Sequence, residues 1–482
     1  MKERVYRKIK SIDLDSFCSD LAASEVCQDT PGELDELVDC YNRTLTSVLD
    51  KHAPLQRKII PQRRRIPWYN DQILAAKRMR RKAEKKWRLS NSIHDLTAYK
   101  SARNFATNLM KKARFDFYQN LIQENSSDQG KLFRVSKQLL NQNCDVPLPP
   151  HFSKTMLANE MANFFVEKIS NIRSKFKECT TEDCQDCAPI MDPQCPSFSS
   201  FQAITEEEAH SIIMNLAKKS SALDPIPTPL VVKCIDVLLP VITKMINISL
   251  DSGYFPSAWR EALVLPTLKK AGLDTVFKNY RPVSNLSFIS KVTERAVFIQ
   301  IDNHMKKHNL YPPLQSAYRK NHSTEMALLK VTNDILMKMN SQHAVLLVLL
   351  DLSAAFDTVD HSLLLRRLQT SFGISGAPLD WFTSYLMARR QRVSIPGALS
   401  DSCSVDWGVP QGSCLGPLLY IIYSSKLFHI IERHLPDSHC YADDSQLYLS
   451  FRPDVLSSQQ DATFAMQKIG RASCRERVSS PV

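Results

Sequence analysis

The sequence contains no long uninterrupted apolar run. None approaches the roughly 18 residues that a membrane-spanning helix needs. The first ten residues, MKERVYRKIK, also lack the apolar core of a secretory signal peptide. These absences predict an intracellular protein with no membrane partner. At 482 residues, 43% of them hydrophobic, the chain is long enough to form two to four domains with apolar cores.

The 13 cysteines lack a repeating frame, so in an intracellular protein they are expected to be free thiols. One group stands apart, with one close pair and two outlying thiols: Cys179, Cys184, Cys187 and Cys195. This spacing is compatible with a tetrahedral zinc site. A second close pair and a nearby histidine are missing, and the alternative is a thiol-rich linker.

Positive charge is concentrated in one segment. Residues 57–118 hold 18 basic and four acidic residues, a net charge of +14, whereas the whole chain carries +12. Aromatic residues recur there, and no glycine or proline follows Pro67, which predicts long basic helices. We expect them to bind nucleic acid; the alternative is a solvated helical face. The expected contacts include Arg63, Arg64, Arg65, Lys77, Arg78, Arg80, Arg81 and Lys82.

The pattern changes after residue 340. The apolar run AVLLVLL (344–350) predicts a central strand, buried on both faces, that ends at Asp351. Helices, a two-stranded pair near 391–408, a further helix and a final strand pair follow. This order predicts an α+β fold with a split βαβ antiparallel sheet and helices on one of its faces.

Three carboxylates mark one end of that predicted sheet. Adjacent Asp443 and Asp444 lie between the last two strands, and Asp351 ends the apolar strand. Taken alone, two adjacent aspartates are typical of a solvated turn. A third carboxylate at the end of a buried strand is costly unless a cation compensates it. Oxygen ligands suit Mg²⁺, so the pattern predicts a metal pair for phosphoryl transfer.

Five blocks together resemble the reverse transcriptases of retrotransposons without long terminal repeats, the LINE-type elements. They are NYRPVSNLSFISKVTERAV (279–297), LQSAYRKNHSTEMAL (314–328), VLLDLSAAFDTVDH (348–361), GVPQGSCLGPLLYIIY (408–423) and YADD (441–444). The resemblance implies the fingers and palm of a right-hand polymerase. It also implies RNA-directed DNA polymerase activity with two Mg²⁺ ions, or Mn²⁺ as the alternative, together with dNTPs, template RNA and a DNA primer or target.

The same resemblance implies roles for individual residues. Asp351, Asp443 and Asp444 would be the catalytic metal ligands, and Tyr441 the aromatic beside them. Phe356 would exclude a 2′-hydroxyl, the alternative being a core phenylalanine; a ring there disfavours an RNA-templated RNA polymerase. Arg319 would contact template or form a structural pair. Asp357 and Asp360 are expected to be helix-capping or surface acids. The remaining nucleotide contacts implied are Arg281, Lys269, Lys270, Gln411 and Gly412.

The expected divisions follow from these blocks. Residues 1–130 form a helical basic region after a missing endonuclease, 131–203 a helical segment with a Cys- and Pro-rich linker, 204–340 the pre-fingers and fingers, and 341–468 the palm, with the reverse transcriptase domain at about 250–468. The thumb is expected to be missing, which would weaken the grip on primer and template and leave this chain inactive or weakly active. Residues 469–482 resemble a translated adapter oligonucleotide, the alternative being an ordinary basic terminus.

The protein is expected in the nucleus, in a cytoplasmic ribonucleoprotein, or in both. The alternative to an enzyme is a non-catalytic remnant that binds nucleic acid through residues 57–118.

Overall fold

The computed structural model describes residues 2–60, 67–126, 128–129, 132–133, 136, 147–178, 196–270, 272–350, 354–434, 437–460 and 463–464. Several residues singled out above lie outside these ranges. They are Arg63, Arg64, Arg65, the four cysteines from Cys179 to Cys195, Asp351 and the tail 469–482.

The chain divides into two compact units, and the smaller one comprises Met1–Arg7 and Leu55–Pro147. Its strands β1 (Lys2–Tyr6) and β2 (Gln56–Ile60) pair antiparallel. Helices α4 (Asp71–Ser90) and α5 (Ile93–Glu124) pack against each other, and the ring of Trp87 stacks on that of Tyr99 at 5.5 Å. The prediction of long basic helices is therefore confirmed for this segment.

The larger unit comprises Lys8–Pro54 and Leu148–Val482. Within the part of the chain that the structure describes, no helix combines the length and apolar character needed to cross a membrane. The α-helices of this unit are α1 (Leu14–Ala22), α2 (Glu25–Gln28), α3 (Leu34–His52), α7 (Lys154–Glu178), α8 (Glu206–Asn215), α9 (Thr228–Lys233), α10 (Ile235–Ser252), α11 (Phe288–Lys307), α12 (Thr324–Asn340), α13 (His361–Phe372), α14 (Gly376–Leu386) and α15 (Gly416–His434). Short 3₁₀ helices span Ile9–Ser11, Ser257–Trp259 and Phe277–Asn279.

One apolar core joins most of these helices. Trp381 and Tyr385 of α14 are fully buried and stacked at 5.3 Å, in a core that also takes side chains from α10, α11 and α15. Leu37 and Leu45 of α3 belong to the same core. The expected division at residues 1–130 therefore differs from the structure: α1, α2 and α3 pack into the larger unit because their apolar faces are buried there.

The first sheet of the larger unit has the order β4-β3-β6-β7, and β8 also pairs with β6. Helix α7 contacts β6 and β7 and forms a second core with β3, β4 and β6, in which Phe165 and Tyr280 are buried. The predicted two-stranded pair near 391–408 is confirmed as β6 and β8. The strands are β3 (Glu261–Leu268), β4 (Tyr280–Asn285), β6 (Arg389–Ile395), β7 (Ala398–Leu399) and β8 (Cys403–Val405).

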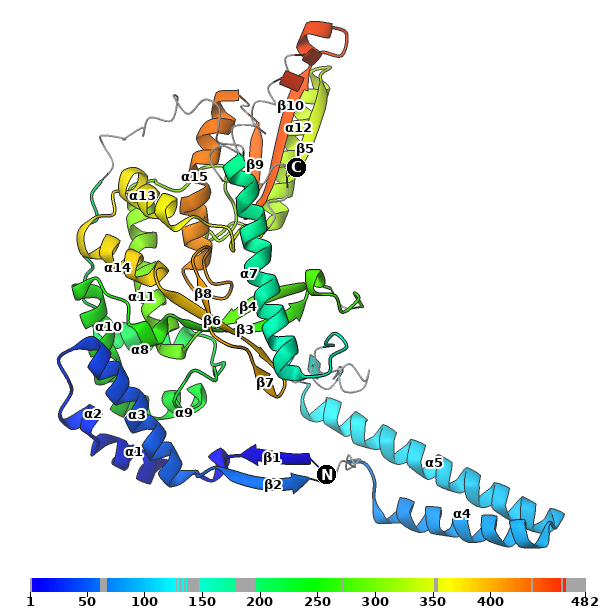
Figure 1. Ribbon diagram of the computed structural model, residues 1–482. Coiled ribbons are helices and arrows are strands. Elements are labelled where there is room, and N and C mark those ends of the chain that lie inside the picture. Colours follow the sequence, from blue (N-terminus) through cyan, green and yellow to red (C-terminus); the bar gives the residue numbers. More distant parts are fainter. Residues whose placement is uncertain are drawn as a thin grey trace. The chain divides into compact units, whose positions relative to one another are not determined.

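The second sheet has the order β5-β10-β9, built from β5 (Ala344–Leu350), β9 (Ser438–Tyr441) and β10 (Asp444–Phe451). Strand β10 is antiparallel to both neighbours, so β5 and β9 are parallel with β10 between them. Figure 1 shows α12 along the β5 and β10 pair. Leu447 on β10 belongs to the main core, whereas Tyr448, on the opposite face, donates to Asp334 of α12 at 2.5 Å.

This sheet differs from the prediction in two ways. The sequence predicted a central β5 buried on both faces, but β5 is paired only with β10 among the described residues, and Leu349 is 69% exposed. The sequence also predicted helices on one face, whereas α12 packs on one face and the main core on the other. An α+β fold is confirmed, but an apolar run does not specify which strands will pair beside it.

Candidate active site

A tight turn at Ala442 and Asp443 joins β9 to β10, whose first residue is Asp444; we call these residues the Asp443 and Asp444 turn. Ala442, just before them, has φ of +60°, which is unusual for a residue with a side chain. The Gln315 side chain holds this turn: Oε1 accepts from the Ala442 amide at 2.9 Å, and Nε2 donates to the Ala442 carbonyl at 3.1 Å. Gln315 is 1% exposed, so its side-chain amide is a buried clamp on the backbone next to Asp443.

The segment that supplies Gln315 lies beside β9. The Ser316 amide donates to the Cys440 carbonyl at 3.0 Å, and the Cys440 amide donates to the Leu314 carbonyl at 2.8 Å. The Ser316 hydroxyl also lies 2.9 Å from Nε2 of His439. Gln315 was not predicted as a site residue, although it belongs to one of the quoted blocks; only the fold places it against the turn.

The strand that leads to Asp351 ends beside the Asp443 and Asp444 turn. Leu350, the last described residue before Asp351, pairs with Ser445 at the beginning of β10. Asp444 is exposed and Asp443 is partly buried. Within the described ranges, which omit Asp351, no group of three or more His, Cys, Asp or Glu side chains could hold a metal. The two described aspartates offer the hard oxygen donors that Mg²⁺ prefers.

Aromatic side chains surround Phe356. Its ring stacks on Tyr420 of α15 with centroids 4.9 Å apart, and Tyr318 approaches edge-on at 6.4 Å. Burial, and then the negative charge of Asp443, raises the pKa of both tyrosines. Phe356, Tyr318 and Tyr420 therefore form one aromatic group, and the charge of Asp443 acts on two of its three rings. Tyr318 and Tyr420 were not predicted as site residues.

Two segments meet next to this aromatic group, and we call them the 354–361 segment and the 405–412 segment. The amide of Gly408 donates to the Val359 carbonyl and that of Val409 to the Phe356 carbonyl, both at 2.8 Å. Gly408 has φ of +84°, and a Cβ there would lie 2.7 Å from the Asp357 carbonyl oxygen. Only glycine fits this close approach without strain.

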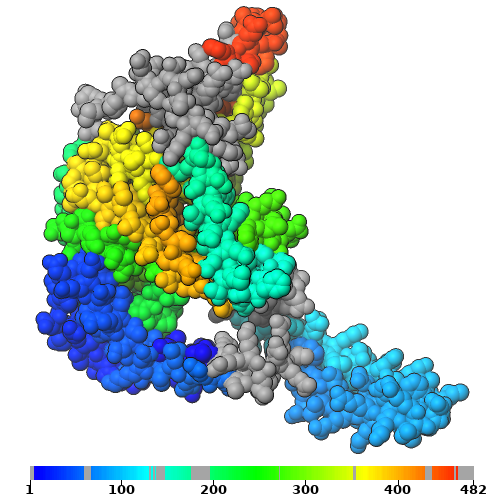
Figure 2. All heavy atoms as spheres, viewed as in Figure 1, coloured from blue at the N-terminus to red at the C-terminus, as the bar shows by residue number. Residues whose placement is uncertain are grey.

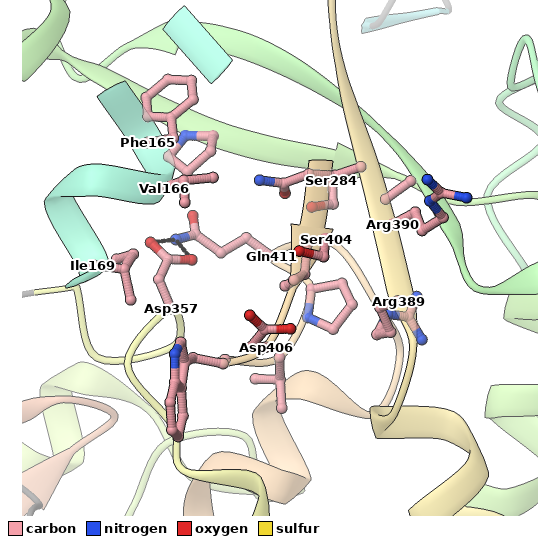
Figure 3. Close-up of a pocket in the computed structure, with 18 of the residues that line it drawn as sticks. Phe165, Val166, Ile169, Ser284, Asp357, Arg389, Arg390, Ser404, Asp406 and Gln411 are labelled. Atoms are coloured by element: carbon pink, nitrogen blue, oxygen red, sulfur yellow. Dashed lines mark hydrogen bonds between the residues drawn. The ribbon is translucent and has the colours of Figure 1, made fainter. Parts of the chain in front are cut away.

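Gln411 and Asp357 join the same two segments through their side chains (Figure 3). Nε2 of Gln411 donates to both carboxylate oxygens of Asp357 at 2.8 Å. Burial raises the pKa of Asp357 to about 6, against the opposing effects of the Gln411 hydrogen bond and the positive charge of Lys168. The expectation that Asp357 is a cap or surface acid was wrong, because the carboxylate faces inward to Gln411.

Asp360 plays the capping role that was expected of it, but it is buried. Its Oδ1 accepts from the Leu363 amide at 3.1 Å at the beginning of α13, and its Oδ2 pairs with Arg173 of α7 at 2.7 Å. Burial opposes ionisation, yet the hydrogen bonds from Ser362, the Leu363 amide and Arg173 lower the pKa of Asp360 to about 2. Asp360 is therefore a charged anchor in the interior.

The 405–412 segment is also tied to the first sheet. The Ser284 amide on β4 donates to the Gln411 carbonyl at 2.8 Å, and a Cβ on Gly412, at φ +124°, would lie 2.5 Å from the Ser284 carbonyl oxygen. The predicted phosphate contacts lie on the β3 and β4 hairpin, where Arg281, Lys269 and Lys270 are exposed. The hairpin that carries these basic residues is thus hydrogen-bonded to the segment that carries Gln411.

A cavity of about 130 Å³ lies beside the Gln411 and Asp357 pair. Its walls come from α7, β3, β4, β6 and the 405–412 segment, and Figure 3 shows Phe165, Val166 and Ile169 of α7 on one side of it. Lys168 of α7 also lines it. Burial, and then the positive charge of Lys269, lowers the pKa of Lys168. Lys168 was not predicted, since α7 lies far upstream of the quoted blocks.

Two groups of predicted nucleic-acid contacts have defined surroundings. Arg319 donates to the carbonyls of Pro312 at 3.2 Å and Gln315 at 3.1 Å and lies over the Tyr311 ring, so the structural pair is the role that the geometry favours. On α4, three predicted contacts are exposed and two are partly buried. The exposed ones are Arg78, Arg81 and Lys82, and the others are Lys77 and Arg80.

Comparison with known proteins is decisive for the part of the chain that holds this site. The family model described as "Reverse transcriptase (RNA-dependent DNA polymerase)" matches residues 268–470. The chain carries a reverse transcriptase domain. That reverse transcriptase domain includes the Asp443 and Asp444 turn, Phe356 and Gln411, whereas α7 lies before it.

Three curated relatives carry the names of polymerases from mobile elements. The chain is 27% identical, over 78% of its length and 42% of the relative, to "Probable RNA-directed DNA polymerase from transposon BS" of Drosophila melanogaster. It is 24% identical, over 82% of its length and 43% of the relative, to "RNA-directed DNA polymerase from mobile element jockey" of the same species. A stretch of 189 residues, 39% of this chain and 20% of the relative, is 34% identical to "Probable RNA-directed DNA polymerase from transposon X-element", also of that species. The chain spans less than half the length of the first two relatives.

Proposed function

We propose that this chain is part of an RNA-directed DNA polymerase of a LINE-type retrotransposon. It would extend a DNA 3′ end with dNTPs, using RNA as template. The observation that carries the proposal is the Asp443 and Asp444 turn: Leu350, which precedes Asp351, pairs with Ser445 next to it, and the charge of Asp443 acts on Tyr318, whose ring packs against Phe356. The names of the relatives support the same reaction.

We assign the two sheets to the two parts of a right-hand polymerase. The β5-β10-β9 sheet, with β5 and β9 parallel around β10, would be the palm. The β3 and β4 hairpin, with exposed Arg281, Lys269 and Lys270, would be part of the fingers. Hydrogen bonds from Gln411 to Asp357 and from Ser284 to Gln411 connect the β3 and β4 hairpin to the 354–361 segment, which follows β5 in the sequence. The phosphate contacts and the carboxylates would then face one substrate.

Asp351, Asp443 and Asp444 would hold two divalent ions. Carboxylate oxygens without nitrogen or sulfur donors suit Mg²⁺, and Mn²⁺ accepts the same ligands. Such ions, when bound, would activate the primer 3′-hydroxyl and stabilise the departing pyrophosphate. The chain's own residues hold the geometry: Gln315 fixes the backbone beside Asp443, and the pairing of β10 with β5 fixes the direction of both strands.

Two residues would select the substrate. The ring of Phe356, held between Tyr420 and Tyr318, would block a ribose 2′-hydroxyl and so favour dNTPs. Gln411, whose Nε2 donates to Asp357, would present its Oε1 to the nucleotide or template. Arg281 would receive the triphosphate, because a guanidinium matches phosphate oxygens.

A second function rests on α4 and α5. Exposed Arg78, Arg81 and Lys82 and the exposed ring of Phe105, at 56%, suit contact with phosphates and bases. This unit would hold nucleic acid whether or not the polymerase is active.

The proposal is tested by primer extension on an RNA template with saturating hybrid, comparing Asp443→Asn with Asp454→Asn. Asp454 is an exposed acid ten residues after Asp444 and serves as the matched control. We expect Asp443→Asn to lower the rate by about 100-fold or more, as when one electrostatic stabiliser is removed. We expect Asp454→Asn to match the unmodified chain. Equal rates for all three proteins would exclude the metal role of Asp443.

A further inference from the structure

Helix α7 lies upstream of the matched reverse transcriptase segment, yet it packs as part of the same unit. Its apolar side forms the second core with β3, β4 and β6. At its beginning, Asn159 exchanges two hydrogen bonds with Asp401, at 2.9 and 2.8 Å. Figure 2 shows α7, in teal, at the surface against the orange part of the chain near residues 390–410. Both halves of the helix therefore have partners in the polymerase part.

Among the side chains that the structure describes in the second half of α7, Arg173 is a buried cation. Its side chain is 10% exposed and that of Asp360 is 3% exposed, with 2.7 Å between Nη2 and Oδ2. Nη1 donates to the Thr358 carbonyl at 3.0 Å. The guanidinium also lies over the Trp407 ring, 3.3 Å from its centroid. One side chain thus contacts the 354–361 segment twice and the 405–412 segment once.

Those two segments carry Phe356 and Gln411, the residues proposed to contact the incoming nucleotide. Phe356 is four residues before Asp360, and Gln411 is four residues after Trp407. The segments are joined by the Gly408 and Val409 amides, by the Gln411 and Asp357 side chains, and by His361, whose Nε2 donates to the Gly408 carbonyl at 2.7 Å. Arg173 adds further contacts between the same two segments, although it lies outside the matched residues 268–470. Because a planar guanidinium makes both hydrogen bonds and the ring contact at once, lysine cannot replace it fully.

We propose that Arg173 is a positioning residue that fixes Phe356 and Gln411 against the incoming dNTP, so that the catalytic unit begins at α7 and not at residue 268. The inference rests on the proposed polymerase function. Arg173 touches no reacting atom; it acts by holding the two segments at one spacing. A displacement of about 1 Å in such a scaffold is enough to lower kcat/KM for dNTP by up to about 100-fold.

The test is steady-state incorporation of one dNTP by the full chain carrying Arg173→Met, Arg173→Lys or Arg366→Met. Arg366, an exposed arginine on α13, is the matched control. We expect Arg173→Met to raise the KM for dNTP about tenfold or more and to lower the preference for dNTP over rNTP, with a smaller change in kcat. Arg173→Lys should be intermediate, since it keeps the charge beside Asp360 but not the second hydrogen bond.

A purely structural role would give a different pattern. In that case the Arg173 variants would lose thermal stability and active fraction, while the KM and the dNTP preference of the folded protein stayed at the value for Arg366→Met; this result overturns the inference. If Arg173→Met does not fold, the KM for dNTP and the dNTP preference of Arg173→Lys decide between the two roles. If the unmodified chain incorporates no dNTP and its melting temperature does not respond to dNTP with Mg²⁺, the proposed function itself fails.

Discussion

Asp357 and Gln411 show how one neighbouring acid can determine what an amide presents to a ligand. With Asp357 ionised, both carboxylate oxygens accept from Nε2 of Gln411, so Oε1 points away from Asp357 (Figure 3). A protonated Asp357 has a hydroxyl that donates, and the amide can turn over to accept from it. Neither residue type nor spacing reveals this pairing, because the two are 54 positions apart in the sequence.

This pairing predicts a pH dependence. Burial raises the pKa of Asp357 to about 6, so the carboxyl group takes up a proton as the pH falls through that value. We expect kcat/KM for dNTP to fall over the same range and the fall to be absent in Asp357→Asn. In Asp406→Asn, a change in an exposed acid of the same cavity, the fall should remain. A pH profile that spans this pKa measures it, and an unchanged fall in Asp357→Asn contradicts the assignment.

The raised pKa of Asp357 also makes the stability of the folded state depend on pH. Because the folded-state pKa lies above the ordinary value of 3.8, Asp357 favours the folded state most below pH 3.8, and this contribution is lost as pH rises through about 6. Replacing Asp357 by asparagine removes this loss of folded-state stability at neutral pH, independently of any effect on catalysis.

Phe356 determines the second residue-scale prediction. Replacing it by valine removes the ring that lies between Tyr420 and Tyr318. We expect the preference for dNTP over rNTP to fall by about tenfold or more, equivalent to about 1.4 kcal/mol. Tyr420→Phe keeps a ring against Phe356 and should retain the preference. Competition between dGTP and GTP on one RNA template measures this preference. An unchanged ratio of dGTP to GTP incorporation in Phe356→Val would mean that Phe356 is only a core residue.

At the scale of elements, local signals were reliable where they describe a single helix or strand. Thr205 is followed by three acids, a pattern typical of a helix start, and the structure has a capping box there between Thr205 and Glu208. The apolar run 344–350 predicted a strand, which is β5. That β5 has one partner strand among the described residues could not be read from the run, because pairing depends on segments distant in the sequence.

The prediction at the scale of elements concerns helix α4. Changing four basic residues of α4 to alanine, Lys77, Arg78, Arg81 and Lys82, should weaken binding of the full chain to nucleic acid. The slope of log affinity against log salt should become less steep by about 0.7 to 0.9 for each phosphate that is no longer neutralised. Lys218→Ala with Lys219→Ala, at exposed positions of the larger unit, is the control. Gel shifts at several salt concentrations measure the slope, and an unchanged slope would leave α4 as a solvated helix.

At the scale of the whole molecule, the motif blocks predicted more of the site than of the domain boundaries. The Asp443 and Asp444 turn, Phe356 and Gln411 lie in one unit, as the blocks required. The contributions of Gln315, Lys168 and Arg173 were not predicted, since each acts through contacts across more than 100 positions. Side chains that position others leave no local pattern.

The division of the chain also differs from its linear order. Residues 8–54 pack with the larger unit although the basic segment follows them, because the apolar side of α3 is buried in the main core. A description of the matched reverse transcriptase segment, which begins at residue 268, would therefore omit α3 and α7, although both supply side chains to cores that the segment shares.

The most direct test of the central claim is single-nucleotide incorporation by the full chain on a DNA primer annealed to RNA, with each of the four dNTPs supplied in turn and Mg²⁺ present. Gel shift at the same concentrations establishes that the hybrid is bound. If this chain is an RNA-directed DNA polymerase, only the dNTP complementary to the templating RNA base is added, and chelation of Mg²⁺ stops the addition. Bound hybrid with no addition, or addition that ignores the template base, would contradict it.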